Sequence, residues 1–213
     1  NHKFKIKGYA DHYDFPWLRF GVDAPTKGND YLLQVDYKIN RATKMYVRYK
    51  SETKEEQLSE SSKISGKRKD NFRFHINYKE GDNWAFANRL ETSSINLGNQ
   101  QEMGYMLYQD VKYKPLFSKI SFTSRYVLFN TPTYDSRIYA YENDVLYGYS
   151  IPAYYGKGSK IYLVAKCNII HNLDFWLRIA HTTYTDRMVL KSGWDEIEGN
   201  KMTEVKLQLR YKF

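Results

Sequence analysis

Strict alternation of apolar and polar residues limits this chain to β-structure more firmly than any other feature of its sequence. The alternation is clearest in residues 204–213, where it continues without an error. The odd-numbered positions carry the apolar face, which consists of Val205, Leu207, Leu209, Tyr211 and Phe213. The even-numbered positions carry the polar face, which consists of Glu204, Lys206, Gln208, Arg210 and Lys212. A period of two indicates a β-strand, and about 9 to 11 residues is the strand length that crosses a bilayer core.

The same period recurs along the chain and predicts ten strands, whereas apolar residues hardly ever recur at the helical spacing of three and four. The predicted strands cover residues 3–22, 30–39, 43–52, 70–79, 84–96, 104–114, 118–129, 159–168, 173–184 and 204–213. Gly8 and Pro16 interrupt the first of them, so we expect a bend or bulge there. No run approaches the roughly 18 apolar residues of a spanning helix, which excludes a helical membrane protein but not a membrane β-barrel.

The connections between the predicted strands alternate between two length classes. Short turns are expected at 40–43, 79–83, 114–118 and 169–172, and longer polar segments at 23–29, 53–69, 97–103, 130–158 and 186–202. Outer-membrane barrels have short periplasmic turns and long extracellular loops. We therefore expect residues 1–213 to form an all-β, antiparallel, up-and-down transmembrane β-barrel of at least ten strands. Because residues 3–10 already resemble the middle of a strand, we expect this to be the C-terminal part of a larger barrel.

The segment 130–158 is predicted to be a long extracellular loop. It is long enough to contain its own hairpin, with arms at 137–142 and 145–151 joined at Asn143 and Asp144. Two further barrel strands at this place would also preserve the alternation of strand directions, so ten strands is a minimum.

Charged residues gather on the face opposite to the apolar one, which predicts a polar, net basic lumen. The basic side chains assigned to the lumen are Arg48, Arg73, Arg89, Arg125, Arg178 and Arg210. The acidic ones are Asp36, Glu91, Asp110 and Asp174. The chain has 33 basic and 24 acidic residues. Either the basic lumen attracts an anionic polymer, or the arginines pair with acids across strands to fill a small barrel, which is the interpretation that we favour.

Aromatic residues are predicted to form two girdles, as amphipathic rings do at both membrane interfaces. Those expected at the short-turn ends are Tyr37, Tyr78, Trp84, Tyr113, Tyr211 and Phe213. Those expected toward the long-loop ends are Tyr31, Tyr49, Phe72, Tyr105 and Tyr126.

The sequence offers little sign of catalysis or of a cofactor. It has one cysteine, and its five histidines show no spacing typical of metal ligands, so neither a metal nor a cofactor is expected. An outer-membrane hydrolase with a rim active site is the alternative from another functional class, and Ser124, His181 and Asp186 are the residues from which it could be assembled. A soluble ligand-binding β-barrel, with the apolar face turned inward, is the third possibility. An enzyme is not favoured.

The terminal strand ending in Tyr211, Lys212 and Phe213 resembles the C-terminal strand by which the barrel assembly machinery recognises bacterial outer-membrane proteins. Beyond it, several segments resemble the C-terminal half of a Bacteroidota family whose members are labelled helix-hairpin-helix domain proteins of the competence type. These segments are residues 15–18, 23–25, 137–146, 150–158 and 195–200.

This resemblance implies the outer membrane of a Gram-negative bacterium as the location, with outer-membrane lipid and the barrel assembly machinery as partners. It also implies an upstream periplasmic domain for which the barrel is an anchor or a passage, linked to the handling of DNA or another anionic polymer. No helix-turn-helix pair of that family is found within residues 1–213, so DNA binding is carried over to no residue here.

Overall fold

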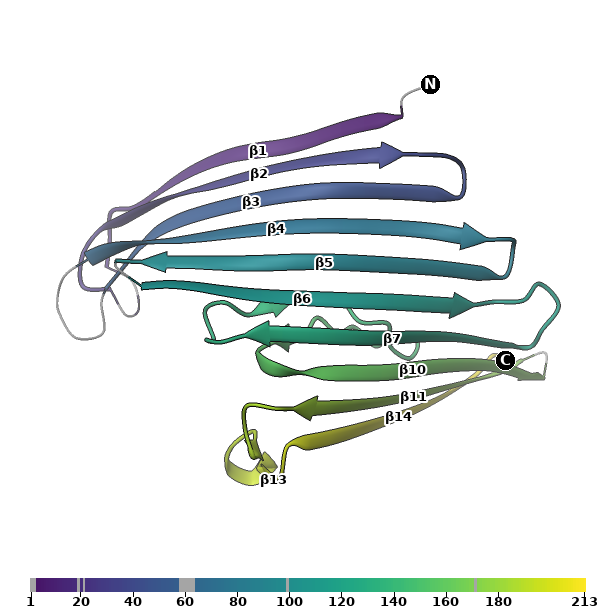
Figure 1. Ribbon diagram of the computed structural model, residues 1–213. Coiled ribbons are helices and arrows are strands. Elements are labelled where there is room, and N and C mark those ends of the chain that lie inside the picture. The colour runs from purple at the N-terminus through teal and green to yellow at the C-terminus, as the bar shows by residue number, and fades with distance from the viewer. Residues whose placement is uncertain (1–2, 19, 21, 58–63, 99, 171) are drawn as a thin grey trace.

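The computed structural model describes residues 3–18, 20, 22–57, 64–98, 100–170 and 172–213, and it is dominated by one antiparallel sheet. Ten strands make up this sheet, each paired with the next one along the chain (Figure 1). They are β1 (Phe4–Phe15), β2 (Thr26–Lys38), β3 (Thr43–Gln57), β4 (Ile64–Glu80), β5 (Trp84–Leu97), β6 (Gln100–Tyr113), β7 (Ile120–Thr131), β10 (Gly156–Ile170), β11 (Leu173–Tyr184) and β14 (Lys201–Tyr211). The prediction of an all-β, up-and-down antiparallel fold is confirmed.

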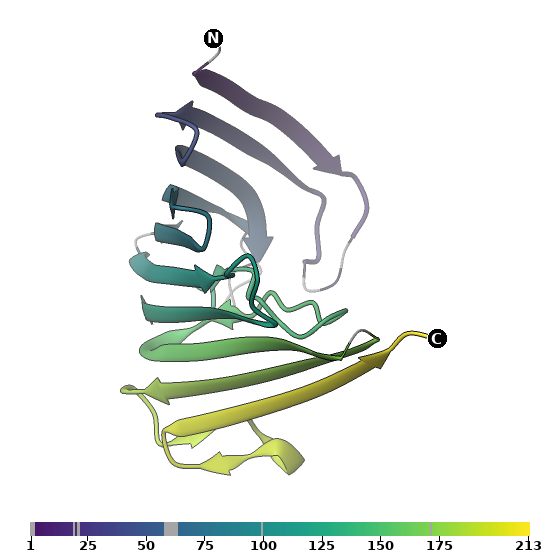
Figure 2. The same cartoon turned by 90° about the vertical axis from the view of Figure 1, so that its right-hand side faces the viewer.

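The sheet is strongly curved but open. Figure 2 shows it as a trough, with β1 and β14 as its two rims. No pairing between β1 and β14 is present in the described part of the chain. The expected closure into a barrel is therefore not observed within these ten strands. Over the same residues, no helix has the length and apolar character to span a membrane.

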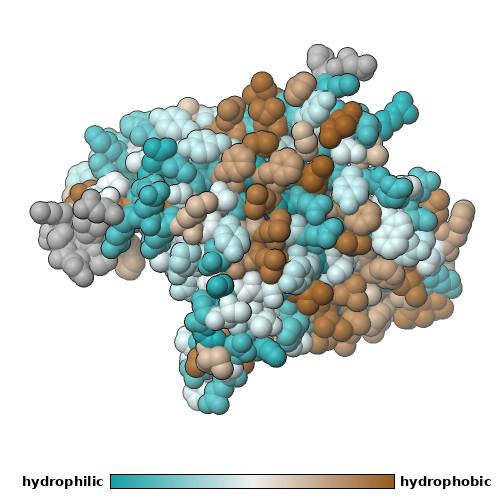
Figure 3. Space-filling view, in the orientation of Figure 1, coloured by the Kyte–Doolittle hydropathy of each residue, from teal (hydrophilic) through white to brown (hydrophobic). Residues whose placement is uncertain are grey.

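The pairing register gives the sheet two chemically different faces. On the convex face, apolar residues of neighbouring strands pair directly, as in the row Val47, Phe74, Leu90, Leu107 and Leu128. Figure 3 shows apolar side chains gathered over the middle and the short-turn side of this face. Large apolar residues here are open to the surroundings: Leu207 is 67% exposed and Ile161 is 51% exposed. Their neighbours on the concave face are enclosed, with Tyr162 only 1% exposed.

Several strands end elsewhere than the alternation predicts. β1 stops at Phe15, because Pro16 cannot donate a ladder hydrogen bond, and the pairing passes Gly8 without a bulge. β5 and β6 are joined by a tight turn that contains Gly98 at a positive φ of 58°, so the long connection expected at 97–103 is wrong. The long loop expected at 53–69 is shorter than predicted, because residues 53–57 of β3 pair with residues 64–68 of β4. Residues 58–63 of this loop lie outside the described residues.

Residues 132–155, which we call the inner segment, leave the sheet after β7 and lie against its concave face. Two short strands, β8 (Ile138–Tyr139) and β9 (Ala153–Tyr154), pair within it, and Glu142 bridges to Ser150. The chain reverses through a turn in which the amide of Gly148 donates to the carbonyl of Val145, rather than at Asn143 and Asp144. The inner segment joins no strand of the large sheet, so it does not add two strands to it.

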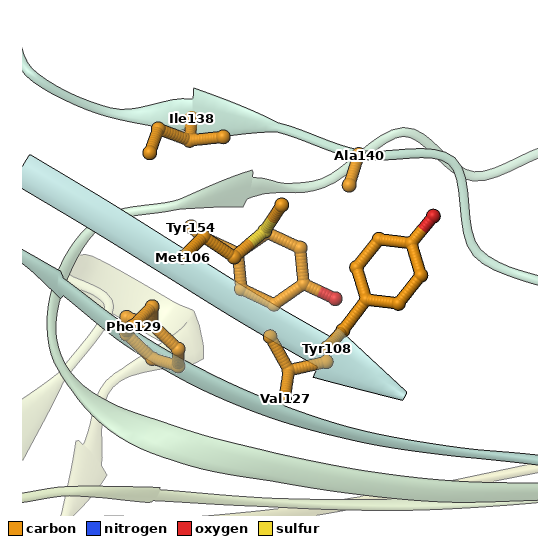
Figure 4. Close-up of a cluster of buried hydrophobic side chains, with 7 residues drawn as sticks. All are labelled: Met106, Tyr108, Val127, Phe129, Ile138, Ala140 and Tyr154. Atoms are coloured by element: carbon orange, nitrogen blue, oxygen red, sulfur yellow. The ribbon is translucent and has the colours of Figure 1, made fainter. Parts of the chain in front are cut away.

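An apolar cluster holds the inner segment to the sheet (Figure 4). Ile138, Ala140 and Tyr154 of the inner segment pack on four side chains of β6 and β7, which are Met106, Tyr108, Val127 and Phe129. All seven are nearly inaccessible. A second excursion between β11 and β14 contains β12 (Val189–Leu190), the 3₁₀ turn η1 (Gly193–Asp195) and β13 (Ile197–Glu198).

Candidate functional site

All ten charged residues assigned to the interior share the concave face of the sheet. The strand register requires this, because directly paired residues of neighbouring strands point to the same side. Arg48 pairs with Arg73, Arg73 with Glu91, and Asp110 with Arg125. The remaining members follow from the same ladders; they are Asp36, Arg89, Asp174, Arg178 and Arg210.

Most of these charges are neutralised by a partner on the adjacent strand. Arg73 holds Glu91 through two hydrogen bonds of 2.7 Å, from Nε and Nη2. Arg125 makes the same bidentate contact with Asp110, in which Nη2 donates to Oδ2 at 2.7 Å. Both of these side chains are buried. Such a pair is expensive to break, because the remaining charge has no water around it. The pairs therefore fix the register of the strands that carry them.

Four further members make contacts of their own. Arg210 pairs with Asp174 across β11 and β14. Asp36 pairs with Lys7 of β1. Arg48 donates from Nε to the Gln34 side-chain carbonyl at 2.7 Å.

Glu142 of the inner segment is the centre of a second ionic cluster, and it is not among the interior charges expected from the sequence. Its carboxylate is fully buried and receives hydrogen bonds from Arg178 at 2.5 Å, from Lys160 at 2.9 Å and from the Tyr154 hydroxyl at 2.6 Å. Arg178 is itself 2% exposed. A carboxylate shared by two buried cations offsets the charges of both, and Glu204 of β14 is a more distant partner, at 3.8 Å from Arg178 and 4.0 Å from Lys160.

Further polar contacts fasten the beginning and the tip of the inner segment. At the long-loop side, Lys67 Nζ lies 2.7 Å from a carboxylate oxygen of Asp135, and Lys69 donates to the Asp135 carbonyl at 2.7 Å. On the other side of the segment, Arg125 donates to the Tyr141 carbonyl at 2.6 Å. Lys206 of β14 holds Asp144 at 2.6 Å. The inner segment is thus bound to strands from β4 to β14.

Two aspartates of the inner segment, Asp135 and Asp144, have pKa values below the ordinary value of an aspartate. The hydrogen bond from Lys67 lowers the pKa of Asp135, outweighing the opposing effect of burial. Burial raises the pKa of Asp144, but the hydrogen bonds from Lys206 and from the Val145 amide, with the charges of Lys206 and Arg178, bring it below the usual value. Both groups are therefore ionised at neutral pH.

The sequence contained one signal for this second cluster. Ile138, Ala140 and Glu142 occupy alternate positions, as three inward side chains of a strand would. The hairpin expected here rests on the length of the segment 130–158 and not on this period, and the partner of Glu142 lies 36 residues away on β11. Nothing in a local period indicates such a partner.

The five residues assigned to the C-terminal assembly strand lie at the apolar side of the β14 edge. Val205, Leu207, Leu209 and Tyr211 project from the convex face, and all are more than half exposed. Phe213 follows β14, and its ring contacts that of Tyr211 at a centroid distance of 5.2 Å.

The residues considered for a hydrolase do not come together. Ser124 lies on β7 and His181 on β11, with β10 between them, which separates them by two strand spacings of about 4.8 Å each. His181 interacts through Nδ1 with the Thr203 hydroxyl at 2.8 Å, and Asp186 pairs with Arg187. Among the described residues, no group of three or more His, Cys, Asp or Glu side chains is arranged to hold a metal ion. Neither a protein-family model nor a curated protein matches this sequence.

Proposed function

We propose that this chain forms the wall of a β-barrel in the outer membrane of a Gram-negative bacterium, with the convex face against lipid and the concave face lining the interior. One observation carries the proposal: large apolar side chains cover the exposed convex face, while the ionic side chains are enclosed and paired on the concave one. A sheet that functions in water would bury the opposite face.

The energetics of the convex face favour an apolar surrounding. Side chains such as Leu33, Leu107 and Leu209 are about half exposed or more, so each would gain on the order of 1 kcal/mol on removal of its remaining surface from water. Proteins of aqueous compartments rarely expose a continuous apolar patch of more than a few hundred Å². The convex rows continue across neighbouring strands, so this face needs an apolar partner of similar extent.

A belt of aromatic rings at the short-turn end supports the same orientation. Tyr78, Phe86, Trp84, Tyr113 and Phe122 contact one another in sequence on the convex face, with ring centroids 4.4 to 6.1 Å apart. Amphipathic rings gather where the hydrocarbon core of a membrane meets its headgroups. We infer that this row marks the periplasmic interface, and that the opposite strand ends extend outside.

The role that we propose for the barrel is to anchor, and to form a restricted passage for, a periplasmic domain upstream of this chain. The inner segment supports a restricted passage, since it lies across the trough and is fastened by ion pairs to both sides of it. The resemblance to helix-hairpin-helix proteins of the competence type suggests DNA or another anionic polymer as the cargo of that upstream domain. The barrel assembly machinery would insert the chain through its terminal strand.

Membrane fractionation of the full-length protein in a Gram-negative host tests the proposal. We expect the protein in the outer-membrane fraction, resistant to extraction by carbonate and released by detergent. We also expect faster gel migration without heating than after boiling, as folded barrels show. A protein that stays monodisperse in buffer without detergent would overturn the proposal.

A further inference from the structure

A cavity of about 490 Å³ lies on the concave face at its short-turn end, below the tip of the inner segment. Strands β3 to β7 form its floor, and Tyr141 and Asn143 of the inner segment contribute to its wall. Ligand pockets for small molecules have volumes of about 300 to 1,000 Å³. This cavity is therefore large enough for a small molecule.

The lining of this cavity is strongly basic. One acidic side chain, Asp110, is present against six basic ones: Arg41, Lys44, Lys79, Arg89, Lys112 and Arg125. Asp110 is already occupied by Arg125 through two hydrogen bonds. Arg41, Lys44, Lys79 and Lys112 make no ion pair with any residue that the structure describes.

Arg89 has no strong acidic partner either. Its closest carboxylate oxygen belongs to Glu91 at 3.9 Å, and both oxygens of Glu91 already receive hydrogen bonds from Arg73. The excess positive charge of the cavity is thus uncompensated within the described chain.

Two buried nitrogen atoms of the lining also lack a hydrogen-bond partner among the described residues. They are Nε of Arg89 and Nδ1 of His75, and the His75 side chain is 93% buried. A buried polar atom without a partner destabilises the protein, and it does so more strongly when the group is charged. The Arg89 Nε–H is a donor without an acceptor, and the neutral His75 ring can donate from Nδ1 in one of its two tautomers, so an acceptor group fits between them.

The side chains that converge in this cavity pack on one aromatic ring, that of Tyr108. The Tyr108 ring packs between two guanidinium groups, with Arg125 at 3.8 Å and Arg89 at 5.0 Å from its centroid. The His75 ring contacts the same tyrosine at 6.3 Å. Donors held in position before binding lose little conformational entropy when the ligand arrives.

We propose that this cavity binds the phosphate group of a small phosphorylated molecule. A phosphate group carries a charge of about −1.5 to −2 and three acceptor oxygens, which suits several converging cations and unsatisfied N–H donors better than a single carboxylate does. Arg89 and His75 contact the phosphate, and Lys44, Lys79 and Lys112 supply the surrounding positive potential. This inference depends on the concave face alone, and it holds whether the convex face lies against lipid or against water.

Calorimetric titration of the full-length protein with inorganic pyrophosphate, at low ionic strength and neutral pH, tests the site. We expect saturable binding that Arg89→Gln weakens at least tenfold, because one charge-assisted hydrogen-bond donor is removed. Arg89→Lys should recover part of the loss. The matched control is Lys166→Gln, which removes a positive charge from the same face outside the cavity, where Lys166 packs on Trp176. We expect it to bind pyrophosphate as the unchanged protein does.

Lys112→Gln is the second variant, because this side chain is exposed and its loss leaves no buried group without a partner. We expect it to weaken binding severalfold while the far-UV circular dichroism stays that of the unchanged protein. Absence of saturable pyrophosphate binding to the unchanged protein would overturn the inference. Equal affinities of the Arg89→Gln and Lys166→Gln variants would overturn it as well.

Discussion

Glu142 is the side chain on which the attachment of the inner segment most depends. Its carboxylate is the acceptor shared by Arg178, Lys160 and Tyr154, all of them buried. Neutralising it leaves two cations of β10 and β11 without their closest partner. The consequence falls on the inner segment first, because the sheet keeps its backbone ladders.

We therefore expect Glu142→Gln to detach the inner segment. Removal of one partner from a buried ion pair costs about 3 to 5 kcal/mol, so segment opening should become at least a hundredfold more frequent. Hydrogen exchange of the amides in residues 136–154 measures this opening. Glu196→Gln, at an exposed position outside the cluster, is the control and should leave the exchange unchanged. Equal exchange in both variants would show that the apolar cluster alone holds the segment.

The alternation in sequence was sufficient to assign side chains to a face, but only in part to identify their partners. Arg73 and Glu91 are neighbours on adjacent strands, so their pairing follows once the register is known. Arg178 and Glu142 belong to a strand and to an irregular segment, and their contact depends on how that segment folds back. The uncompensated charge of Arg89 could not be predicted either. It can be recognised only when the structure shows which cation each nearby carboxylate binds.

At the scale of the strand, the two faces of β14 should differ in how well they tolerate an introduced arginine. Leu207 projects from the convex face and Gln208 from the concave face. Under the proposed function, Leu207→Arg places a charge near the membrane midplane at a cost of about 2 to 4 kcal/mol. Gln208→Arg should change the stability by much less. Urea titration of both variants refolded in lipid vesicles measures the difference, and equal stabilities would contradict a lipid-facing convex surface.

Alternation predicted where strands run, but not where they end. Toward the long-loop side, β4 begins with polar residues on both faces, such as Lys67 and Arg68, so no apolar period marks it as a strand. Pairing with β3 nevertheless continues there, because backbone hydrogen bonds do not require an apolar face. The alternation therefore predicts strands that end before the observed ones on the long-loop side. It also predicts a long β5–β6 connection, whereas the two strands are joined by a tight turn.

The inner segment should keep its ionic contacts under mildly acidic conditions. Because the folded pKa of Asp144 is lowered from the ordinary value of 3.8, this carboxylate stabilises the docked segment above that pH. The stabilisation is lost as the pH falls through the lower folded pKa. We expect hydrogen exchange in residues 141–149, corrected for the intrinsic pH dependence, to stay constant from pH 7 to about 4.5. Lys206→Gln removes the main lowering hydrogen bond, so its opening should begin at a higher pH than in the unchanged protein.

For the whole molecule, the number, order and direction of the strands could be predicted from sequence, whereas the shape could not. Ten alternating segments and their connections were sufficient to give an up-and-down sheet. Curvature and closure depend on the twist and stagger of the strands along the whole sheet, which no single segment encodes. The observed trough leaves β1 and β14 each with one unpaired edge among the described residues.

These two edges give the sharpest test at the scale of the whole molecule. About half of the amides in an edge strand point away from its single neighbour, and in lipid such groups must still find acceptors. If the full-length protein forms a closed barrel, the amides of β1 and β14 should exchange with solvent as slowly as those of β6, which has neighbours on both sides. Hydrogen exchange with mass spectrometry in detergent or nanodiscs measures this. The short β12–β13 pair serves as the rapidly exchanging control. Fast exchange of the outward amides of β14, beside a protected β6, would mean that the trough remains open and that its convex face does not lie within a bilayer.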